Sequence, residues 1–138
     1  MNYATVTNRI NSLIEQSTTP KFPTLQKENT SFKPTPPNAW LRTTILPAEP
    51  TYISTGRHRQ LRYSGLVQVD SFIAANTTSN DPSVDKLVNL FNDYNNRYSV
   101  EDGYAIIIDY AYRGGSSQGT DWYMTPVMVR WSAMKVGP

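Results

Sequence analysis

Gly115–Gly119 reads G-x-S-x-G and is the stretch of this 138-residue chain that most resembles a catalytic motif. In that motif a serine nucleophile stands on a sharp strand-to-helix turn, and a histidine later in the chain serves as its base. Here strand-forming runs flank the stretch on both sides, and the only histidine, His58, comes earlier. The glycines and serines fit a flexible loop better, so the sequence does not predict a nucleophile at Ser117.

Other kinds of catalytic chemistry have no stronger candidates. The chain has no cysteine and one histidine, which excludes disulfides, thiol nucleophiles and metal sites built on cysteine. Glu101 and Asp102 are adjacent, but they precede Gly103 in an expected turn, where neighbouring carboxylates are usually solvated. We therefore expect no enzymatic activity, no metal and no cofactor.

The densest group of basic residues is a candidate contact surface. Arg57, His58 and Arg59 follow Gly56, and Arg62 lies close by, which indicates an exposed loop tip. Such a loop can bind phosphate, as in DNA. It can equally be a solvated hairpin loop whose charges protect a sheet edge from aggregation. A lone histidine among arginines tends to stay neutral, which makes His58 a poor ligand or catalyst.

Two helices would position these loops. Apolar residues at helical spacing predict an amphipathic helix over about residues 2–17. The second helix starts at Asp81, an N-cap acceptor, and Pro82, which suits the first helical position. The buried stripe expected for the second helix comprises Val84, Leu87, Val88, Phe91 and Tyr94.

Strand signals account for most of the remaining chain. Residues 39–46, 61–73, 104–112 and 122–131 have strand-like composition, and 51–54 can form a short return strand. Simple alternation puts Tyr110 and Tyr112 on the same face as Tyr104, Ile106 and Ile108. Gly65, inside a strand, indicates a bulge or a close backbone approach.

Two segments are expected to be irregular. Residues 18–38 are rich in proline and are predicted to form an extended arm with one short strand near Phe22–Gln26. Pro34 and Pro37 have the spacing of a PxxP recognition ligand, although connectors often contain such clusters. Residues 113–121 are predicted to be a flexible hairpin loop. Arg113, Gly114, Gly115, Ser116 and Ser117 are its candidate contact residues.

Together these elements predict one α+β domain over residues 1–138. Strands come in hairpins and helices are too few for repeated βαβ units, which favours a mostly antiparallel sheet of four to five strands with two helices packed on one face. The N-terminus lacks the pattern of a signal peptide, and no run is apolar enough to span a membrane.

Charge is distributed unevenly along the chain. Residues 20–69 hold seven basic and two acidic side chains, whereas residues 70–109 hold two basic and seven acidic side chains. If these segments occupy separate faces, the subunit is dipolar and suited to head-to-tail pairing with its own copy, the geometry that builds rings. If they intermix on the folded surface, the charges cancel.

Several strand motifs, in this order, resemble one family. WLRTTILP, LRYSGLVQVDSF, the Asp81-Pro82 helix and WYMTPVMV are similar to the tail terminator (tail completion) proteins of long non-contractile-tailed bacteriophages. The likeness runs from the first helix to about Trp131. It rests on Leu41, Arg42, Leu46, Pro47, Arg62, Tyr63, Gly65, Leu66, Gln68, Val69, Asp70, Trp122, Tyr123, Pro126 and Val127.

The resemblance implies a structural virion protein without a catalytic site, assembled in the host cytoplasm. It implies a homohexameric ring at the head-proximal end of the tail tube, which ends tube polymerisation and joins the tail to the head connector. Its implied partners are its own copies, the tail tube protein and the connector protein, with DNA only passing through the lumen and no membrane. On this basis Arg57, His58, Arg59 and Arg62 are expected at a ring surface or lumen, and Gly114–Thr120 as a second contact loop ordered on assembly.

Two alternative functions stay open. The first is another phage ring or tube component, such as a head-completion protein or a tube subunit. The second is a small nucleic-acid-binding module, because the chain combines the basic loop with many tyrosines and tryptophans. A single α+β domain that does not assemble would also fit the composition.

Overall fold

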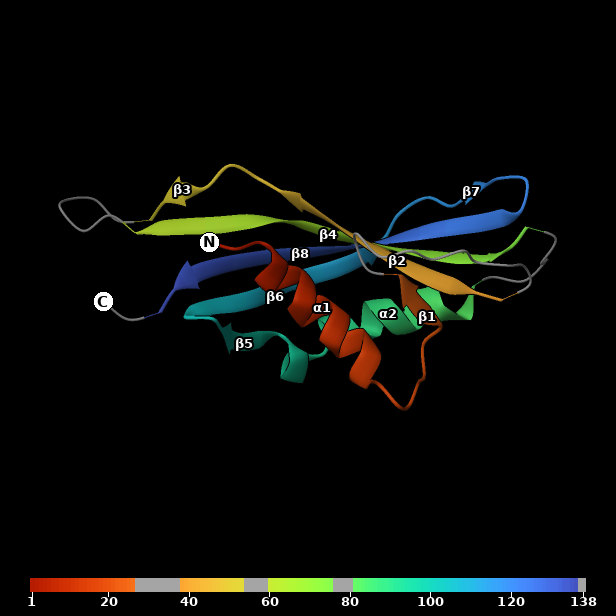
Figure 1. The fold of residues 1–138 in the computed structure, drawn as a ribbon, viewed down its shortest axis with the longest axis horizontal. Coiled ribbons are helices and arrows are strands. Elements are labelled where there is room, and N and C mark those ends of the chain that lie inside the picture. The colour runs from red at the N-terminus through yellow and green to blue at the C-terminus, as the bar shows by residue number, and fades with distance from the viewer. Residues whose placement is uncertain (27–37, 54–59, 76–80, 137–138) are drawn as a thin grey trace.

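The computed structural model describes residues 1–26, 38–53, 60–75 and 81–136, and it shows a long, strongly bent sheet with two helices (Figure 1). In chain order the elements are α1 (Ala4–Gln16), β1 (Thr24–Gln26), β2 (Trp40–Pro47), β3 (Thr51–Tyr52), β4 (Leu61–Ala74), α2 (Pro82–Asn92), the 3-10 turn η1 (Tyr94–Asn96), β5 (Tyr98–Glu101), β6 (Tyr104–Arg113), β7 (Ser117–Gln118) and β8 (Trp122–Lys135). No helix in these ranges is long and apolar enough to cross a membrane.

The sheet is built around two long central strands. The main strand order is β1-β2-β4-β8-β6-β5, while β3 pairs with one end of β4 and β7 with one end of β8. All pairs are antiparallel except β1 with β2, which is parallel. β4 and β8, each 14 residues long, pair from Arg62–Met134 to Ala74–Trp122 and form the spine of the molecule.

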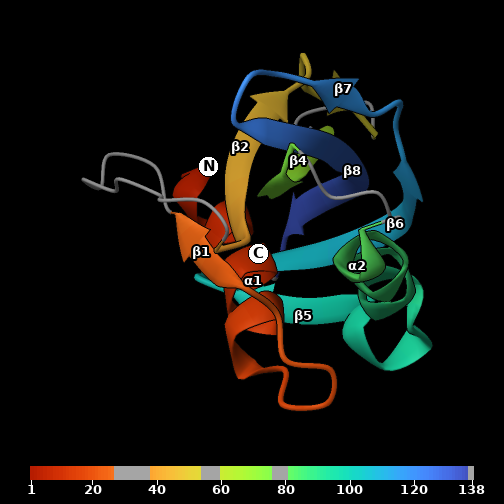
Figure 2. The ribbon, with the colours of Figure 1, turned by 90° about the vertical axis from the view of Figure 1, so that its right-hand side faces the viewer.

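The predicted fold class is wrong in both the number of strands and the shape of the sheet. Half of the described residues lie in eight strands, and the sheet curls into a half-barrel instead of carrying two helices on one face of a four- or five-stranded layer (Figure 2). The two strands that the sequence did not predict, β5 and β7, are only four and two residues long. Strands this short contain too few residues to reveal a two-residue alternation.

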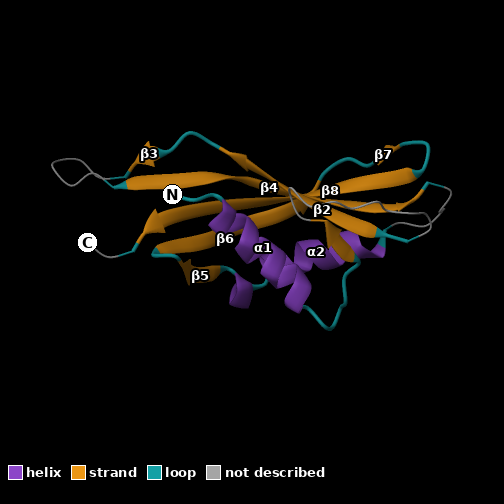
Figure 3. Ribbon diagram, viewed as in Figure 1, coloured by secondary structure: helices purple, strands orange, loops and turns teal. Residues whose placement is uncertain are grey.

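The first helix connects opposite sides of the curl (Figure 3). α1 packs against β2, and at its start Thr5 Oγ1 donates to Asp102 Oδ2 at 3.0 Å in the β5–β6 turn. One turn later Arg9 NH2 donates to the carbonyl of Asn96 at 3.3 Å. These contacts tie the N-terminal helix to segments almost 100 residues away, so α1 holds the curled sheet in shape.

The second helix forms as its sequence predicts, but it ends earlier. Asp81 caps α2 by accepting from the Ser83 backbone N–H at 2.9 Å, and Pro82 occupies its first turn. The side chains of Val84, Leu87 and Phe91 are buried against β6 and β8. Tyr94 was expected in this stripe, but it lies in η1 and is 83% exposed. The helix stops at Asn92, whose side chain pairs with both backbone groups of Ala111.

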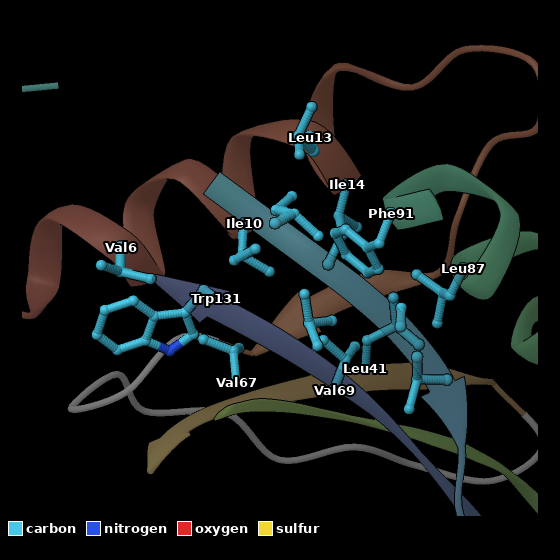
Figure 4. Packing of buried hydrophobic residues seen from close by; sticks show 14 of the residues in the cluster. Val6, Ile10, Leu13, Ile14, Leu41, Val67, Val69, Leu87, Phe91 and Trp131 are labelled. Carbon is cyan, nitrogen blue, oxygen red and sulfur yellow. The ribbon is translucent and has the colours of Figure 1, made fainter. Parts of the chain in front are cut away.

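One continuous core joins both helices to the inner side of the curl (Figure 4). Its strand residues follow the expected alternation, with Val67 and Val69 of β4 directly opposite Val129 and Val127 of β8. Trp131 is the largest side chain that is fully buried. Burying a large apolar side chain contributes roughly 1.5–3 kcal/mol to folding stability. This face of the sheet therefore forms the interior of the protein.

Candidate interaction surfaces

The candidate residues of the basic loop are only partly within the described structure. Arg57, His58 and Arg59 lie outside the described residues. Arg62 is exposed at the start of β4, opposite Thr51 of β3 and Met134 of β8. Pairing with Met134 puts its side chain on the outer face of the sheet, the face turned away from the helices and core.

The second candidate loop is held against β8 by several contacts. The Gly114 backbone N–H donates to the Pro126 carbonyl at 2.8 Å, and a Cβ on Gly114 would lie 2.9 Å from Pro126 Cγ. Ser116 Oγ lies 2.7 Å from Thr125 Oγ1. Arg113 is exposed, and Ser117 is in β7 opposite Met124. Gly115 has open space around it.

The structure does not bring the two candidate groups together. Arg62 is opposite Met134, and Arg113 is opposite Val127, seven residues earlier on β8. Seven residues of strand span roughly 23 Å, so the two arginines lie far apart along the sheet. Any single partner contacting both would have to extend along the strands.

An exposed sheet face between Arg62 and Arg113 was missed by sequence reasoning. On the outer face, one row across four strands consists of Leu46, Leu66, Arg130 and Tyr110, and the next consists of Thr44, Gln68, Met128 and Tyr112. Leu46, Tyr110 and Tyr112 are 44%, 48% and 45% exposed, respectively. Large apolar and aromatic side chains gathered on an open face are typical of interaction surfaces.

A β-bulge explains why the tyrosines were assigned to the wrong face. The register between β6 and β8 shifts between Ile108, which is opposite Trp131, and Tyr110, which is opposite Arg130. The extra residue is Asp109, whose carboxylate accepts from Ser132 Oγ at 3.4 Å. An extra residue in one strand reverses the alternation beyond it. The prediction that Tyr110 and Tyr112 share a face with Ile106 and Ile108 is therefore wrong.

The buried carboxylate of Asp70 connects two strands on the outer face. Asp70 of β4 is 1% exposed and accepts from Arg42 of β2, with Arg42 NH2 at 2.9 Å and Nε at 3.3 Å. Gln68 Nε2 donates to the other carboxylate oxygen at 2.7 Å. The Arg42 guanidinium also lies 5.1 Å from the centre of the Phe72 ring. Charge-assisted bonds of this kind hold β2 and β4 in one register.

The acidic pair in the β5–β6 connection has a structural role. Asp102 and Gly103 both have positive φ, 51° and 80°, which is the geometry of a two-residue type I′ hairpin turn. The Asp102 side chain accepts from Thr5, and the Gly103 carbonyl accepts from the Val136 backbone N–H at 2.8 Å. The turn thus anchors β5, the four-residue strand at this edge of the main sheet.

The two charge segments lie on different sides of the sheet in the described parts of the chain. Strands β1, β2 and β3 and most of β4 come from the basic segment, while β5, β6 and α2 come from the acidic one. β8 lies between β4 and β6 and separates them. The described strands themselves carry few charges, since β1 and β3 have none and β4 has both Arg62 and Asp70, so the sheet has no basic and acidic side and head-to-tail pairing through charge stays a prediction.

The G-x-S-x-G stretch lacks the context of a nucleophile. Ser117 is in a short strand between two strands, whereas the motif requires a strand-to-helix turn. Among the described residues there is also no group of three or more histidine, cysteine, aspartate or glutamate side chains placed to hold a metal ion.

Comparison with known proteins points to one family. The family model described as phage tail terminator protein matches residues 4–131, which is nearly the whole chain. No protein in the curated set matches the sequence. One solved structure, of a protein without a descriptive name, superimposes with a TM-score of 0.61 at 22% identity, covering 98% of this chain and 94% of that one. At this identity the likeness concerns the fold alone.

Proposed function

Because this chain belongs to the phage tail terminator family, we propose that it forms a ring on the head-proximal end of the tail tube, ends tube polymerisation and joins the tail to the head connector. The match to the family model over residues 4–131 is the observation that carries this proposal. The family is structural and not enzymatic, and the chain is a component of virion tail assembly.

The surfaces of the subunit support this role. A ring subunit needs two different contact surfaces on opposite sides, so that each copy can bind the next in the same orientation. In the described part of the chain the two sides of β8 are built from different strands, β4 and β2 on one side and β6 and β5 on the other. A terminator also needs surface for the tube and the connector, and the open outer face with Leu46, Tyr110 and Tyr112 offers apolar area.

A tube-growth experiment tests the proposed termination. Purified chain is added in increasing amounts to polymerising tail tube protein, and tube lengths are measured by electron microscopy. We expect growth to stop and short tubes to accumulate in proportion to the added chain. Unchanged tube lengths would contradict termination, and extension of the tubes by the chain itself would identify it as a tube subunit.

The basic loop is assigned to a ring surface or the lumen as part of the same proposal. Arg57→Glu with Arg59→Glu reverses the charge there and should reduce ring assembly or DNA ejection, because both depend on electrostatic contacts. Lys86→Glu, on the exposed side of α2, is the matched control. Phage carrying each variant are compared in a plaque assay and by counts of complete tails. Wild-type assembly and infectivity of the double variant would refute this assignment.

A further inference from the structure

The strand β5 forms one edge of the main sheet. Among the described strands it pairs only with β6, and it lies at the lower margin of the sheet in Figure 1. Its sequence, Tyr98–Glu101, contains no proline or lysine, which are residues that commonly protect an edge. Tyr98 and Val100 are 59% and 51% exposed. An accessible edge of this kind is a template for another strand.

The hydrogen-bond alternation of the β5–β6 ladder determines which backbone groups of β5 are available. The Ile108 backbone N–H donates to the Arg97 carbonyl at 2.8 Å, so these two residues form a hydrogen-bonded pair. In antiparallel strands such pairs alternate with pairs that share no hydrogen bond. Every second residue from Arg97 onward therefore points its backbone groups toward β6, whereas the N–H and C=O groups of Tyr98 and Val100 point away from β6. These outward groups can bind a strand placed beside β5.

The sequence of this edge is complementary to itself in the antiparallel direction. From Arg97 to Glu101 it reads RYSVE. When two copies run antiparallel with their Ser99 residues opposite each other, Arg97 lies opposite the second copy's Glu101. In the same register Tyr98 lies opposite the second copy's Val100. Pairs of opposite charges and pairs of an aromatic with a β-branched side chain both stabilise neighbouring strands.

The outward backbone groups fit the same register. Tyr98 and the second copy's Val100 form a hydrogen-bonded pair there, which uses all the N–H and C=O groups that point away from β6. Arg97 and the second copy's Glu101 then form a pair without backbone hydrogen bonds. In such a pair the Cα atoms are about 4.5 Å apart and the side chains are closer than in a hydrogen-bonded pair.

The charges of Arg97 and Glu101 are available for this contact. Neither side chain makes a hydrogen bond or an ion pair with another described residue. Both point to the same face of β5, but four residues of strand separate them by roughly 13 Å, so they cannot pair within one chain. An antiparallel copy brings each close to its opposite charge. A parallel copy would instead bring like charges together at each end of the strand, which is destabilising.

From this edge we infer that two copies of the free chain pair through β5, antiparallel and about a two-fold axis beside Ser99, so that their sheets become continuous. The inference goes beyond the proposed ring and does not rest on it. A two-fold contact closes with two copies, whereas the proposed ring repeats a head-to-tail contact. One short strand buries less surface than a stable dimer needs, so the dimer is weak and depends on concentration.

Charge reversals test the pairing of Arg97 with Glu101. Arg97→Glu and Glu101→Arg are made singly and together, and the dissociation constant of the dimer is measured by sedimentation equilibrium at concentrations up to about 1 mM. Each single reversal opposes like charges at two symmetric places, so we expect roughly tenfold weaker dimerisation. The double variant restores both opposite-charge pairs and should dimerise as the wild type does. The two single reversals change the net charge in opposite directions, so a general charge effect cannot weaken both.

Lys86→Glu, on the exposed side of α2, is the control because it changes the net charge as Arg97→Glu does, and it should leave the dissociation constant unchanged. Circular dichroism checks that each variant is folded. A wild-type chain that stays monomeric, or a double variant as weak as the single ones, would overturn the inference. These measurements use the chain alone, so their outcome is independent of whether it terminates tail tubes.

Engineered cysteines test the register, since the natural chain has none. Arg97→Cys and Glu101→Cys chains are mixed and oxidised mildly. Their Cα atoms would be about 4.5 Å apart across the contact, close enough for a disulfide, whereas two chains of one variant would hold their cysteines at least roughly 13 Å apart. We expect a covalent dimer from the mixture and none from either variant alone. A dimer from Arg97→Cys alone, or no cross-link in the mixture, would overturn the inference.

A proline tests the backbone contact. Val100→Pro removes an N–H that points away from β6, so the β5–β6 ladder keeps its hydrogen bonds. We expect the variant to keep its far-UV circular dichroism and to dimerise roughly tenfold more weakly, whereas Val100→Thr dimerises normally. Wild-type dimerisation of a folded Val100→Pro chain would contradict the inference.

Discussion

Asp70 and Arg42 form a pair whose two members have very different access to water. The Asp70 side chain is 2% exposed and that of Arg42 is 46% exposed. Removing Arg42 leaves a buried carboxylate with Gln68 as its remaining side-chain donor, whereas removing the Asp70 charge leaves a guanidinium that water can reach. The two halves of the pair should therefore contribute unequally to stability.

We predict that Arg42→Met lowers the free energy of unfolding by about 2 kcal/mol, while Asp70→Asn lowers it by about 1 kcal/mol or less. Urea unfolding followed by circular dichroism measures both changes. The double variant Arg42→Met with Asp70→Asn should be more stable than Arg42→Met alone, because no buried charge remains. A double variant that is less stable than either single one would contradict this explanation.

Gly65 is a residue at which the close-approach expectation is confirmed. A Cβ there would lie 2.5 Å from the Leu46 carbonyl oxygen and 2.9 Å from Pro47 Cα, both backbone atoms. We predict that Gly65→Ala destabilises the fold by about 2 kcal/mol, in the range of overpacking. Gly115→Ala, which has open space, is the control in the same thermal or urea melt. Equal stability of the two variants would mean that β2 can move away from β4.

At the scale of elements, the cap of α2 links a helix to the sheet. The Asp81 carboxylate accepts from the Ser83 N–H and also makes a short hydrogen bond with Ser71 of β4. Asp81→Ala should lower the free energy of unfolding by about 1–2 kcal/mol, because a helix loses its cap and Ser71 loses its partner. Asp81→Asn keeps an acceptor and should cost less. Hydrogen exchange of the first α2 amides shows whether the loss is local, and no change there would contradict the prediction.

The elements that the sequence predicts correctly are the long and periodic ones. The helix expected over residues 2–17 is α1, the Asp81-Pro82 start of α2 is confirmed, and the strand expected over residues 61–73 is β4. Each has enough residues for a helical or two-residue period to be distinguished. The short strand expected near Phe22–Gln26 is also present as β1.

What the sequence did not predict depends on contacts between distant segments. Asp109 looks like an ordinary strand residue, and only the pairing of β6 with β8 makes it a bulge. The return strand expected over residues 51–54 is present as β3, whereas the two-residue strand β7 was not predicted and exists because β8 extends beyond β6. Since the open face depends on where the helices pack, the exposure of Tyr110 and Tyr112 could not be deduced from local pattern.

The positions of the candidate contact residues also could not be deduced from local sequence pattern. Arg62 and Arg113 were selected for their charge and loop context, and both are exposed, but their partners on β8 are seven residues apart. Arg57, His58 and Arg59 lie outside the described residues, so their place at a ring surface or lumen stays a prediction. The edge strands were not recognised because an edge is a property of the whole sheet order.

At the scale of the whole molecule, the fold presents different surfaces to its surroundings. The inner side of the curl is closed by α1, α2 and a continuous core, while Leu46, Tyr110 and Tyr112 are exposed on the outer face. In the described part of the chain, β4 and β2 lie on one side of β8 and β6 and β5 on the other. A subunit with two unlike sides can repeat around an axis, which is the property that a terminating ring requires.

The mass of the assembled protein tests this ring most directly. Native mass spectrometry or light scattering is performed at several concentrations, first on the chain alone and then with tail tubes. We predict one discrete species of six subunits that forms on the tubes, whether or not the free chain is monomeric. A chain that stays monomeric and does not bind tubes, or one that grows into open-ended filaments, would contradict the account.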